Sequence, residues 1–202
     1  MTTRPRCDSC GVPLPLTSQH WRLHDGRLQC PTCHATAVYD PGAARAIFDQ
    51  TVTGLVAQLG MSLNVGVDFR IVDAPTLESL RAEGNSAPPP GLTTLGLYRR
   101  RGHLRTIYML YGLPKLAFRT TVAHEYAHAW QGEHCPLLRD EALREGHAEW
   151  VAYQHLCWLG CTKAVDRMLQ MAHPYRAALE RVLALERQLG PAGLQRYLMT
   201  AE

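Results

Sequence analysis

The sequence lacks the long apolar runs and the strong charge imbalance that mark several large classes of protein. No run of about 18 apolar residues occurs among the 202 residues, so no membrane span is expected. Residues 1–10 contain no apolar segment of the kind found in secretory signals. The formal net charge of +3 is too small to demand a nucleic-acid partner. These absences favour a soluble cytoplasmic protein without a membrane partner.

Internal repeats are also absent, and with 46% hydrophobic residues the chain can bury one core and a small satellite module. One local basic cluster comprises Arg99, Arg100, Arg101 and Arg105. Such a cluster is more typical of a solvated loop or hairpin tip than of a nucleic-acid contact. Nucleic acid is therefore not an expected partner.

Cysteine is not scarce, and its spacing is informative. The seven cysteines include two C-x-x-C pairs, Cys7 with Cys10 and Cys30 with Cys33. Two such pairs can present four thiolates to one tetrahedral Zn²⁺, and they fit a reducing compartment better than a disulfide framework. Because four cysteines complete the coordination shell, we expect this zinc to be structural. A module this small has little apolar core, so zinc would supply much of its folding energy.

The segment between the two cysteine pairs predicts a β-hairpin that turns at Asp25–Gly26. Residues 1–38 are therefore interpreted as a LIM-like (treble-cysteine) zinc ribbon, a module that could also bind a partner protein. Residues 39–202 are assigned to a second domain.

The middle of the chain predicts a mixture of helices and strands. Apolar residues at helical spacing predict a core helix over 43–60. Alternating apolar residues predict a strand over 62–75 and a hairpin over 95–114. Between them we expect a short helix over 76–84 and an exposed proline-rich loop over 85–92. A strand beside the helix that follows could pair with an extended peptide.

The stretch TVAHEYAHAW, residues 121–130, contains an H-E-x-x-H pattern. No proline or glycine interrupts it, and its alanines favour a helix. On a helix, His124 and His128 lie on one face, so their imidazoles can converge on one metal ion. Glu125 lies beside the first histidine, where its carboxylate can take a proton from an attacking water. The alternative is an amphipathic helix whose histidines make ordinary hydrogen bonds.

A hydrolytic zinc site needs a third protein ligand besides two histidines. The next predicted helix offers Glu141, Glu145, His147 and Glu149. We assign Glu145, because Gly146 beside it would let this helix approach the H-E-x-x-H helix closely. Glu149, one turn further on, would accept a hydrogen bond from the far nitrogen of a ligating histidine. The alternative is that these carboxylates form a solvated face.

Several polar side chains are candidates for stabilising the oxyanion that forms when water attacks a carbonyl. They are His147, Tyr153, His155 and Tyr126, and the sequence does not choose among them. Helical periodicity over 162–173 and 175–189, followed by a short terminal helix, predicts a helical cover for the active-site domain.

These pieces together resemble the plant DA-one-type growth-regulating peptidases, which place LIM-type zinc modules before a gluzincin-like peptidase domain. The resemblance follows the same order through nearly the whole chain, in PRCDSC, DGRLQCPTCHATAV, YGLPKL, VAHEYAHAW, REGHAEWVA and GLQRYL. It implies an α+β fold in which a zincin (minigluzincin-like) domain with a small antiparallel-rich sheet follows the ribbon. By motif position it implies His124, His128 and Glu145 as zinc ligands and Glu125 as general base. A chain this short is more like a bacterial member of the group.

The sequence therefore predicts a zinc metallopeptidase that acts on protein or peptide substrates and holds one structural and one catalytic Zn²⁺. A first alternative is a SprT-like peptidase acting on DNA-bound proteins, with the arginines from Arg99 to Arg105 as the nucleic-acid contact. In those proteins the zinc module usually follows the peptidase helix, whereas here it comes first. A second alternative is a non-catalytic adaptor whose zinc module binds a partner protein.

Overall fold

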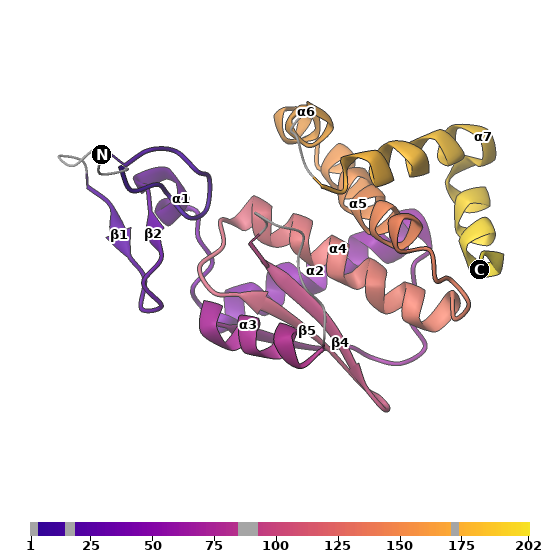
Figure 1. Ribbon diagram of the computed structural model, residues 1–202, viewed down its shortest axis with the longest axis horizontal. Coiled ribbons are helices and arrows are strands. Elements are labelled where there is room, and N and C mark those ends of the chain that lie inside the picture. The colour runs from indigo at the N-terminus through magenta and orange to yellow at the C-terminus, as the bar shows by residue number, and fades with distance from the viewer. Residues whose placement is uncertain (1–3, 15–18, 85–92, 171–173) are drawn as a thin grey trace.

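The computed structural model describes residues 4–14, 19–84, 93–170 and 174–202, and it has the mixed α+β architecture that the sequence predicts. A small cysteine-rich module lies at one end, a sheet with its helices in the middle, and the C-terminal helices at the other end (Figure 1). The stretch 85–92, expected to be an exposed loop, lies outside the described residues. None of the described helices is both long and apolar enough to cross a membrane.

The N-terminal module is built on the predicted hairpin. Strand β1 (Trp21–Arg22) pairs antiparallel with β2 (Leu28–Gln29). Gly26, in the turn, has a φ of +89°, a left-handed conformation that glycine adopts without the steric cost of a Cβ. The short helix α1 (Pro31–Ala35) follows the hairpin. The Asp8 N–H donates to the Leu28 carbonyl of β2, which places the first C-x-x-C pair beside the second.

The central sheet has the strand order β3-β5-β4. Strand β5 (Leu104–Leu110) pairs antiparallel with β4 (Gly96–Arg101), as predicted, but pairs parallel with β3 (Asp68–Val72). The expectation of an antiparallel-rich sheet is therefore wrong, since one of the two pairings is parallel. The chain passes from β3 through α3 (Ala74–Glu83) to β4, which runs opposite to β3, and the hairpin then returns β5 in the direction of β3. Strand β4 is left at the edge of the described sheet.

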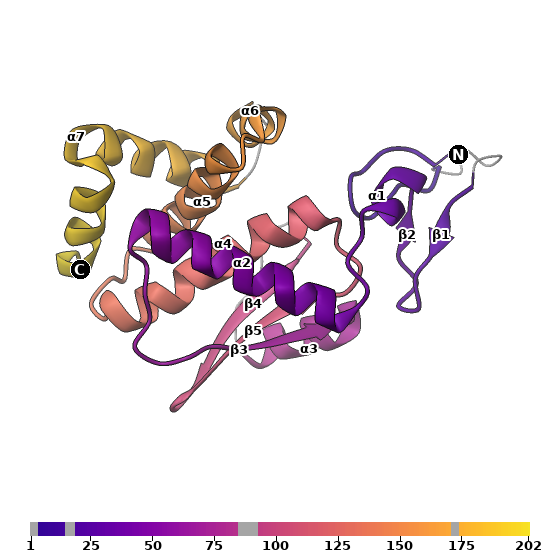
Figure 2. The same cartoon turned by 180° about the vertical axis from the view of Figure 1, so that it is seen from behind.

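Helices cover both faces of this sheet. Helix α3 lies on one face, and α2 (Pro41–Leu59) and α4 (Lys115–His134) lie on the other (Figures 1 and 2). Helix α2 begins where the Asp40 carboxylate accepts a hydrogen bond from the Ala43 N–H, and it ends at Gly60, whose φ is +66°. Helix α4 turns its apolar side into the core with Phe118, Val122, Tyr126 and Trp130. The core thus fixes the helix that carries the H-E-x-x-H pattern.

The C-terminal helices stack onto α4. Helix α5 (Glu141–Trp158) packs along α4, and α7 (Arg176–Thr200) packs along α5. The shorter α6 (Thr162–Gln170) contacts α5. Gly190, with φ +70° and ψ 167°, interrupts α7 where the sequence predicts a break before a terminal helix.

Gly146 has a different role from the one expected. A Cβ at this position would lie 2.4 Å from the carbonyl oxygen of Ala178 and 2.9 Å from Cγ2 of Val182. Both residues belong to α7, so Gly146 permits the close approach of α5 to α7. The expectation that it lets α5 approach the H-E-x-x-H helix is wrong.

Hydrogen bonds hold the zinc ribbon against the rest of the chain. The Arg27 guanidinium donates to the Tyr111 carbonyl at 2.5 Å, and the Gln29 amide donates to the Gly112 carbonyl at 2.6 Å. Asp25, whose side chain is fully buried, pairs with Arg27 at 2.8 Å and fixes the guanidinium. The orientation of the ribbon is therefore set by buried polar contacts as well as by the chain connection.

Candidate metal centres

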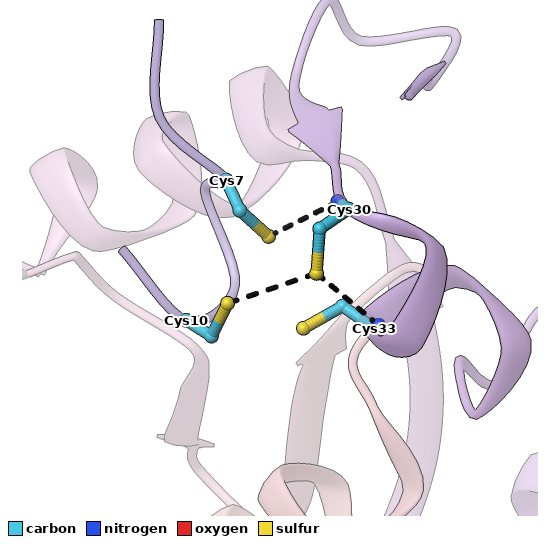
Figure 3. Close-up of side chains that lie close together, drawn as sticks. All are labelled: Cys7, Cys10, Cys30 and Cys33. Carbon is cyan, nitrogen blue, oxygen red and sulfur yellow. Dashed lines mark hydrogen bonds between the residues drawn. The ribbon is translucent and has the colours of Figure 1, made fainter. Parts of the chain in front are cut away.

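The two C-x-x-C pairs form the first candidate metal centre (Figure 3). The sulfur atoms of Cys7, Cys10, Cys30 and Cys33 all lie within 4.8 Å of one another. The Sγ atoms of Cys10 and Cys30 are 3.8 Å apart. Two thiolates bound about 2.3 Å from a tetrahedral zinc are separated by about 3.8 Å. The four donors therefore fit a Zn²⁺ ion, and their closure around one point supports a structural role.

Backbone N–H groups donate to two of these sulfur atoms, whereas burial raises the pKa of Cys10 and of Cys33. The Cys30 N–H donates to the Cys7 Sγ at 3.4 Å, and the Cys33 N–H donates to the Cys30 Sγ at 3.5 Å. Burial raises the pKa of Cys7, but the backbone donors of Cys30, Cys10 and Ser9 outweigh it and lower that pKa to about 7. Because the thiolate is the form that binds zinc, the fold prepares this cysteine as a ligand near neutral pH.

A second cluster joins α4 to α5. His124 and His128 project from α4 and Glu145 from α5, and one ligand atom of each lies within 4.8 Å of the others. The two Nε2 atoms are 3.1 Å apart, and each is 3.5 Å from an oxygen of Glu145. Nitrogen and oxygen ligands of a tetrahedral zinc are separated by about 3.3–3.6 Å. The spacing of these three groups fits a three-ligand zinc site.

The outer ring nitrogens of both histidines have acceptors, and these orient the inner nitrogens. The Nδ1 of His128 lies 2.9 Å from Oε1 of Gln131. The Gln131 amide nitrogen donates to the Arg144 carbonyl, so the amide oxygen must face His128 and accept from its Nδ1–H. The Nδ1 of His124 lies 3.3 Å from Oε1 of Glu149. An imidazole that donates from Nδ1 presents a lone pair at Nε2, so both lone pairs are directed at one centre.

Burial and neighbouring charges both shift the pKa values of the three residues in this cluster. Burial disfavours the charged form of His124, but its contacts with Glu145 and Glu149 outweigh burial and raise its pKa well above the ordinary value. Burial and the neighbouring His124 lower the pKa of His128. Burial also works against ionisation of Glu145, yet the two histidines hold its pKa below the usual range. Glu145 is therefore ionised near neutral pH, as a metal ligand must be.

Glu125 lies where α4 meets the edge strand. Its Oε2 accepts a hydrogen bond of 2.7 Å from the Tyr98 N–H of β4, and the residue is only 8% exposed. Gly96 makes the approach possible, because a Cβ there would lie 2.6 Å from Cγ2 of Thr121 and 2.8 Å from Cγ of Glu125. The carboxylate is thereby held at the edge of β4 that faces away from β5, and its residue is adjacent to His124 in the sequence.

Tyr175, immediately before α7, lines the same cavity as Glu149 and was not predicted from the sequence. Burial raises its pKa to about 12, together with the negative charges of Glu145, Glu141, Glu149 and Glu125. The tyrosine therefore lies within electrostatic reach of the carboxylates around the cluster and keeps its phenolic proton. No local sequence pattern could have indicated it, because Tyr175 follows Glu145 by 30 residues in the sequence. Gln131 was also missed, although its position three residues after His128 places it on the same side of α4.

Two of the candidate oxyanion donors lie inside the core instead of at the cluster. His147 is fully buried; its Nδ1 lies 3.0 Å from the Gln131 amide, which stands between His147 and His128. Burial, with a contribution from His128, lowers the pKa of His147 to about 3, so it is neutral. Tyr126 uses its hydroxyl to donate to the Met61 carbonyl at 2.9 Å. Neither side chain is available to a substrate oxygen.

The other two candidates lie too far along α5. Tyr153 and His155 follow Glu145 by eight and ten residues, which corresponds to about 12 and 15 Å along a helix. The hydroxyl of Tyr153 neighbours Cys157 and Glu186, and burial with these two groups raises its pKa. His155 is fully buried, and burial and Arg119 lower its pKa to about 4. Sequence spacing alone could not exclude them, because it does not say where α5 crosses α4.

The remaining candidates also have places outside the cluster. Glu141, weighed as a third ligand, is exposed in the first turn of α5. The basic cluster lies on the predicted hairpin, where Arg100 and Arg101 are exposed as expected, and three of its four arginines also pair with carboxylates. Arg99 and Arg101 both contact Glu83, Arg105 pairs with Glu133, and Arg100 donates to the Gly132 carbonyl.

The fold and the cysteine centre together define a mixed α+β protein with an N-terminal, LIM-like four-cysteine zinc ribbon. The chain is similar to LIM domain-containing protein HDR3 of Oryza sativa subsp. japonica, with 24% identity over 62% of this chain and 31% of that protein. It is also similar to Protein DA1 of Arabidopsis thaliana, with 26% identity over 62% of this chain and 29% of that protein. The similarity thus spans about a third of the length of these relatives. No protein-family model matches the chain, and no solved structure gives a significant match.

Proposed function

We propose that this protein is a zinc-dependent peptidase that hydrolyses peptide bonds in protein substrates. The observation that carries the proposal is the convergence of His124 Nε2, His128 Nε2 and the Glu145 carboxylate beside Glu125. Three protein ligands leave one position of a tetrahedral zinc for water or substrate, which is the arrangement of catalytic sites. The resemblance to the plant DA-one-type peptidases supports the same activity.

The residues of the site have distinct roles in this proposal. His124, His128 and Glu145 would hold a zinc ion that, when bound, would polarise a substrate carbonyl and lower the pKa of a water molecule. Glu125 takes a proton from the attacking water at Oε1, while Oε2 stays on the Tyr98 N–H, and it then protonates the leaving amine. Gln131 and Glu149 keep the imidazoles in one orientation.

The edge strand supplies a way to position the substrate. Among the described strands, β4 has its outer edge beside Glu125, since Tyr98 directs its N–H away from β5 and toward that carboxylate. An extended peptide can add to such an edge through backbone hydrogen bonds, which would bring its carbonyl groups past the cluster. This arrangement favours a peptide substrate over a small molecule.

Tyr175 is assigned as the donor to the oxyanion. A phenol whose pKa is about 12 remains protonated throughout the neutral range and can donate a hydrogen bond. Tyr175→Phe should lower kcat by about 10²-fold, with little change in KM or zinc content. Steady-state kinetics with a cleaved peptide test this role, and Tyr153→Phe is the matched control. An unchanged kcat in Tyr175→Phe would remove the assignment.

The proposed function itself is tested by digestion of a broad peptide library, with and without a chelator, beside zinc quantification. We expect cleavage that disappears when zinc is removed from the protein and returns when zinc is restored. Cleavage that survives complete removal of zinc, or the absence of any cleavage by protein that retains zinc at both centres, would contradict it.

A second candidate is a non-catalytic adaptor that binds a partner protein through the zinc ribbon. The closed four-cysteine centre and the similarity to a LIM domain-containing protein favour it. The same library distinguishes the two functions, because an adaptor with both metal centres occupied would leave every peptide intact.

A further inference from the structure

A large cleft separates the zinc ribbon from the C-terminal helices. It has a volume of about 870 Å³, which is near the upper end of the range for ligand pockets. One wall comes from the ribbon, through Cys10 and Thr32, and the floor comes from α4, through Thr120. Glu149, whose carboxylate lies 3.3 Å from His124, and Tyr175 also line it. The cleft therefore connects the ribbon with the proposed reaction centre.

The two walls hold fixed positions. The ribbon is docked by hydrogen bonds from Arg27 and Gln29 to the carbonyls of Tyr111 and Gly112, in the segment that joins β5 to α4. The opposite wall is α6, which packs against α5. Because both walls are anchored to the elements that carry the zinc ligands, the cleft keeps its place relative to the cluster.

The chemistry of the cleft is apolar with a basic rim. Its lining exposes far more apolar than polar surface. On α6, the exposed side chains of Lys163 and Arg167 border it, and neither forms an ion pair within the described parts of the chain. Arg176 also borders it but is paired with Glu180 at 2.8 Å. The carboxylate at the inner end, Glu149, is in contact with His124. The outer rim thus carries uncompensated positive charge.

We propose that this cleft binds an extended substrate segment in which apolar side chains are accompanied by acidic ones, with Lys163 and Arg167 contacting the acidic side chains. The inference rests on the proposed function, since it names the substrate class of that site. It gives the zinc ribbon a direct part in substrate recognition, as one wall of the cleft. An extended peptide suits the space because the lining of the cleft reaches from the ribbon to α6 and includes Leu95, the residue before β4.

Binding can be measured without hydrolysis, in the full-length Glu125→Gln protein loaded with zinc. The probes are fluorescein-labelled peptides with one apolar framework that carry glutamate, glutamine or lysine at the same positions, followed by fluorescence anisotropy. The glutamate peptide should bind at least about tenfold more tightly than the glutamine peptide, which corresponds to about 1.4 kcal/mol. The preference should shrink at high salt, because the contacts are near the surface.

Charge reversal tests the residues themselves. The double substitution Lys163→Glu/Arg167→Glu should abolish the preference for glutamate and favour the lysine peptide. The control is Arg187→Glu, a comparable change at an exposed position of α7 that does not line the cleft, and it should keep the preference. Equal binding of the three peptides, or a preference that survives the double substitution, overturns the inference.

A third substitution tests the ribbon wall. Thr32→Trp fills the cleft from the ribbon side and should weaken binding of every peptide, whereas Gln19→Trp, on the ribbon but outside the cleft, should not. Unchanged binding in Thr32→Trp removes the ribbon from the proposal. The outcomes distinguish this proposal from the proposed function. Charge-selective binding without cleavage by the parent protein would contradict only the proposed peptidase activity. Cleavage without charge selectivity would contradict only the proposed binding preference of the cleft.

Discussion

Substitution of Glu125 by glutamine is expected to reduce peptide hydrolysis by at least about 10³-fold while both zinc sites stay filled. The amide has the same shape, and its oxygen can still accept the Tyr98 N–H, so β4 and α4 should keep their contact. It cannot, however, take a proton from water near neutral pH. The loss should therefore appear in kcat, because no zinc ligand has been altered.

The measurements are hydrolysis of a peptide found in the library, zinc content and thermal unfolding. Glu78→Gln on α3 is a suitable control, since its exposed carboxylate pairs with Arg81 far from the cluster. That variant should hydrolyse the peptide at the parental rate. If Glu125→Gln retains parental activity with full zinc, another residue serves as the base and the mechanism is wrong.

The second large effect is expected from His128→Ala. Two groups of side chains in the described chain are arranged for a metal, and this change removes a ligand from only one of them. Zinc content should fall from two ions per chain to one, and hydrolysis should fall to the level of the chelated protein. The ribbon should remain folded, because its four thiols are untouched.

The matched variant is Cys10→Ser, which alters the other centre. It should also lower the zinc content, because the zinc of the ribbon is lost. Its effect on substrate binding should be larger than its effect on kcat. Zinc analysis by mass spectrometry of the native protein, combined with kinetics, distinguishes the two cases. If His128→Ala retains two zinc ions, the His–His–Glu cluster is not a metal centre, and the imidazoles serve only the packing of α4 against α5.

Local patterns carried most of the correct predictions about the fold. The Asp25–Gly26 turn and the hairpin of β4 and β5 were found because a hairpin is specified by residues close together in the chain. The stop of α2 at Gly60 and the break at Gly190 depend on the backbone freedom of a single residue. The parallel pairing of β3 with β5 was missed, because the hairpin pattern says nothing about which strand joins its other side.

In the candidate site too, some contacts follow from local spacing in the sequence and others follow only from the packing of helices. The side chains of His124 and His128 meet because their spacing matches one helical turn, whatever surrounds the helix. Glu145 joins them only because α5 packs back on α4, and the reason offered from the sequence was wrong, since Gly146 faces α7. His147 is close to Glu145 in the sequence but is screened by Gln131 in space.

The sequence by itself therefore determined the ligand types, the two C-x-x-C pairs and the pairing of imidazoles on one helix, because those features are set by backbone geometry over a few residues. The tertiary structure alone decided that Tyr175 lies near the carboxylates, that Gln131 is oriented by the Arg144 carbonyl, and that the ribbon and α6 face one cleft. These relations join residues tens of positions apart. They depend on how helices cross and how deeply side chains are buried, which spacing along the chain does not encode.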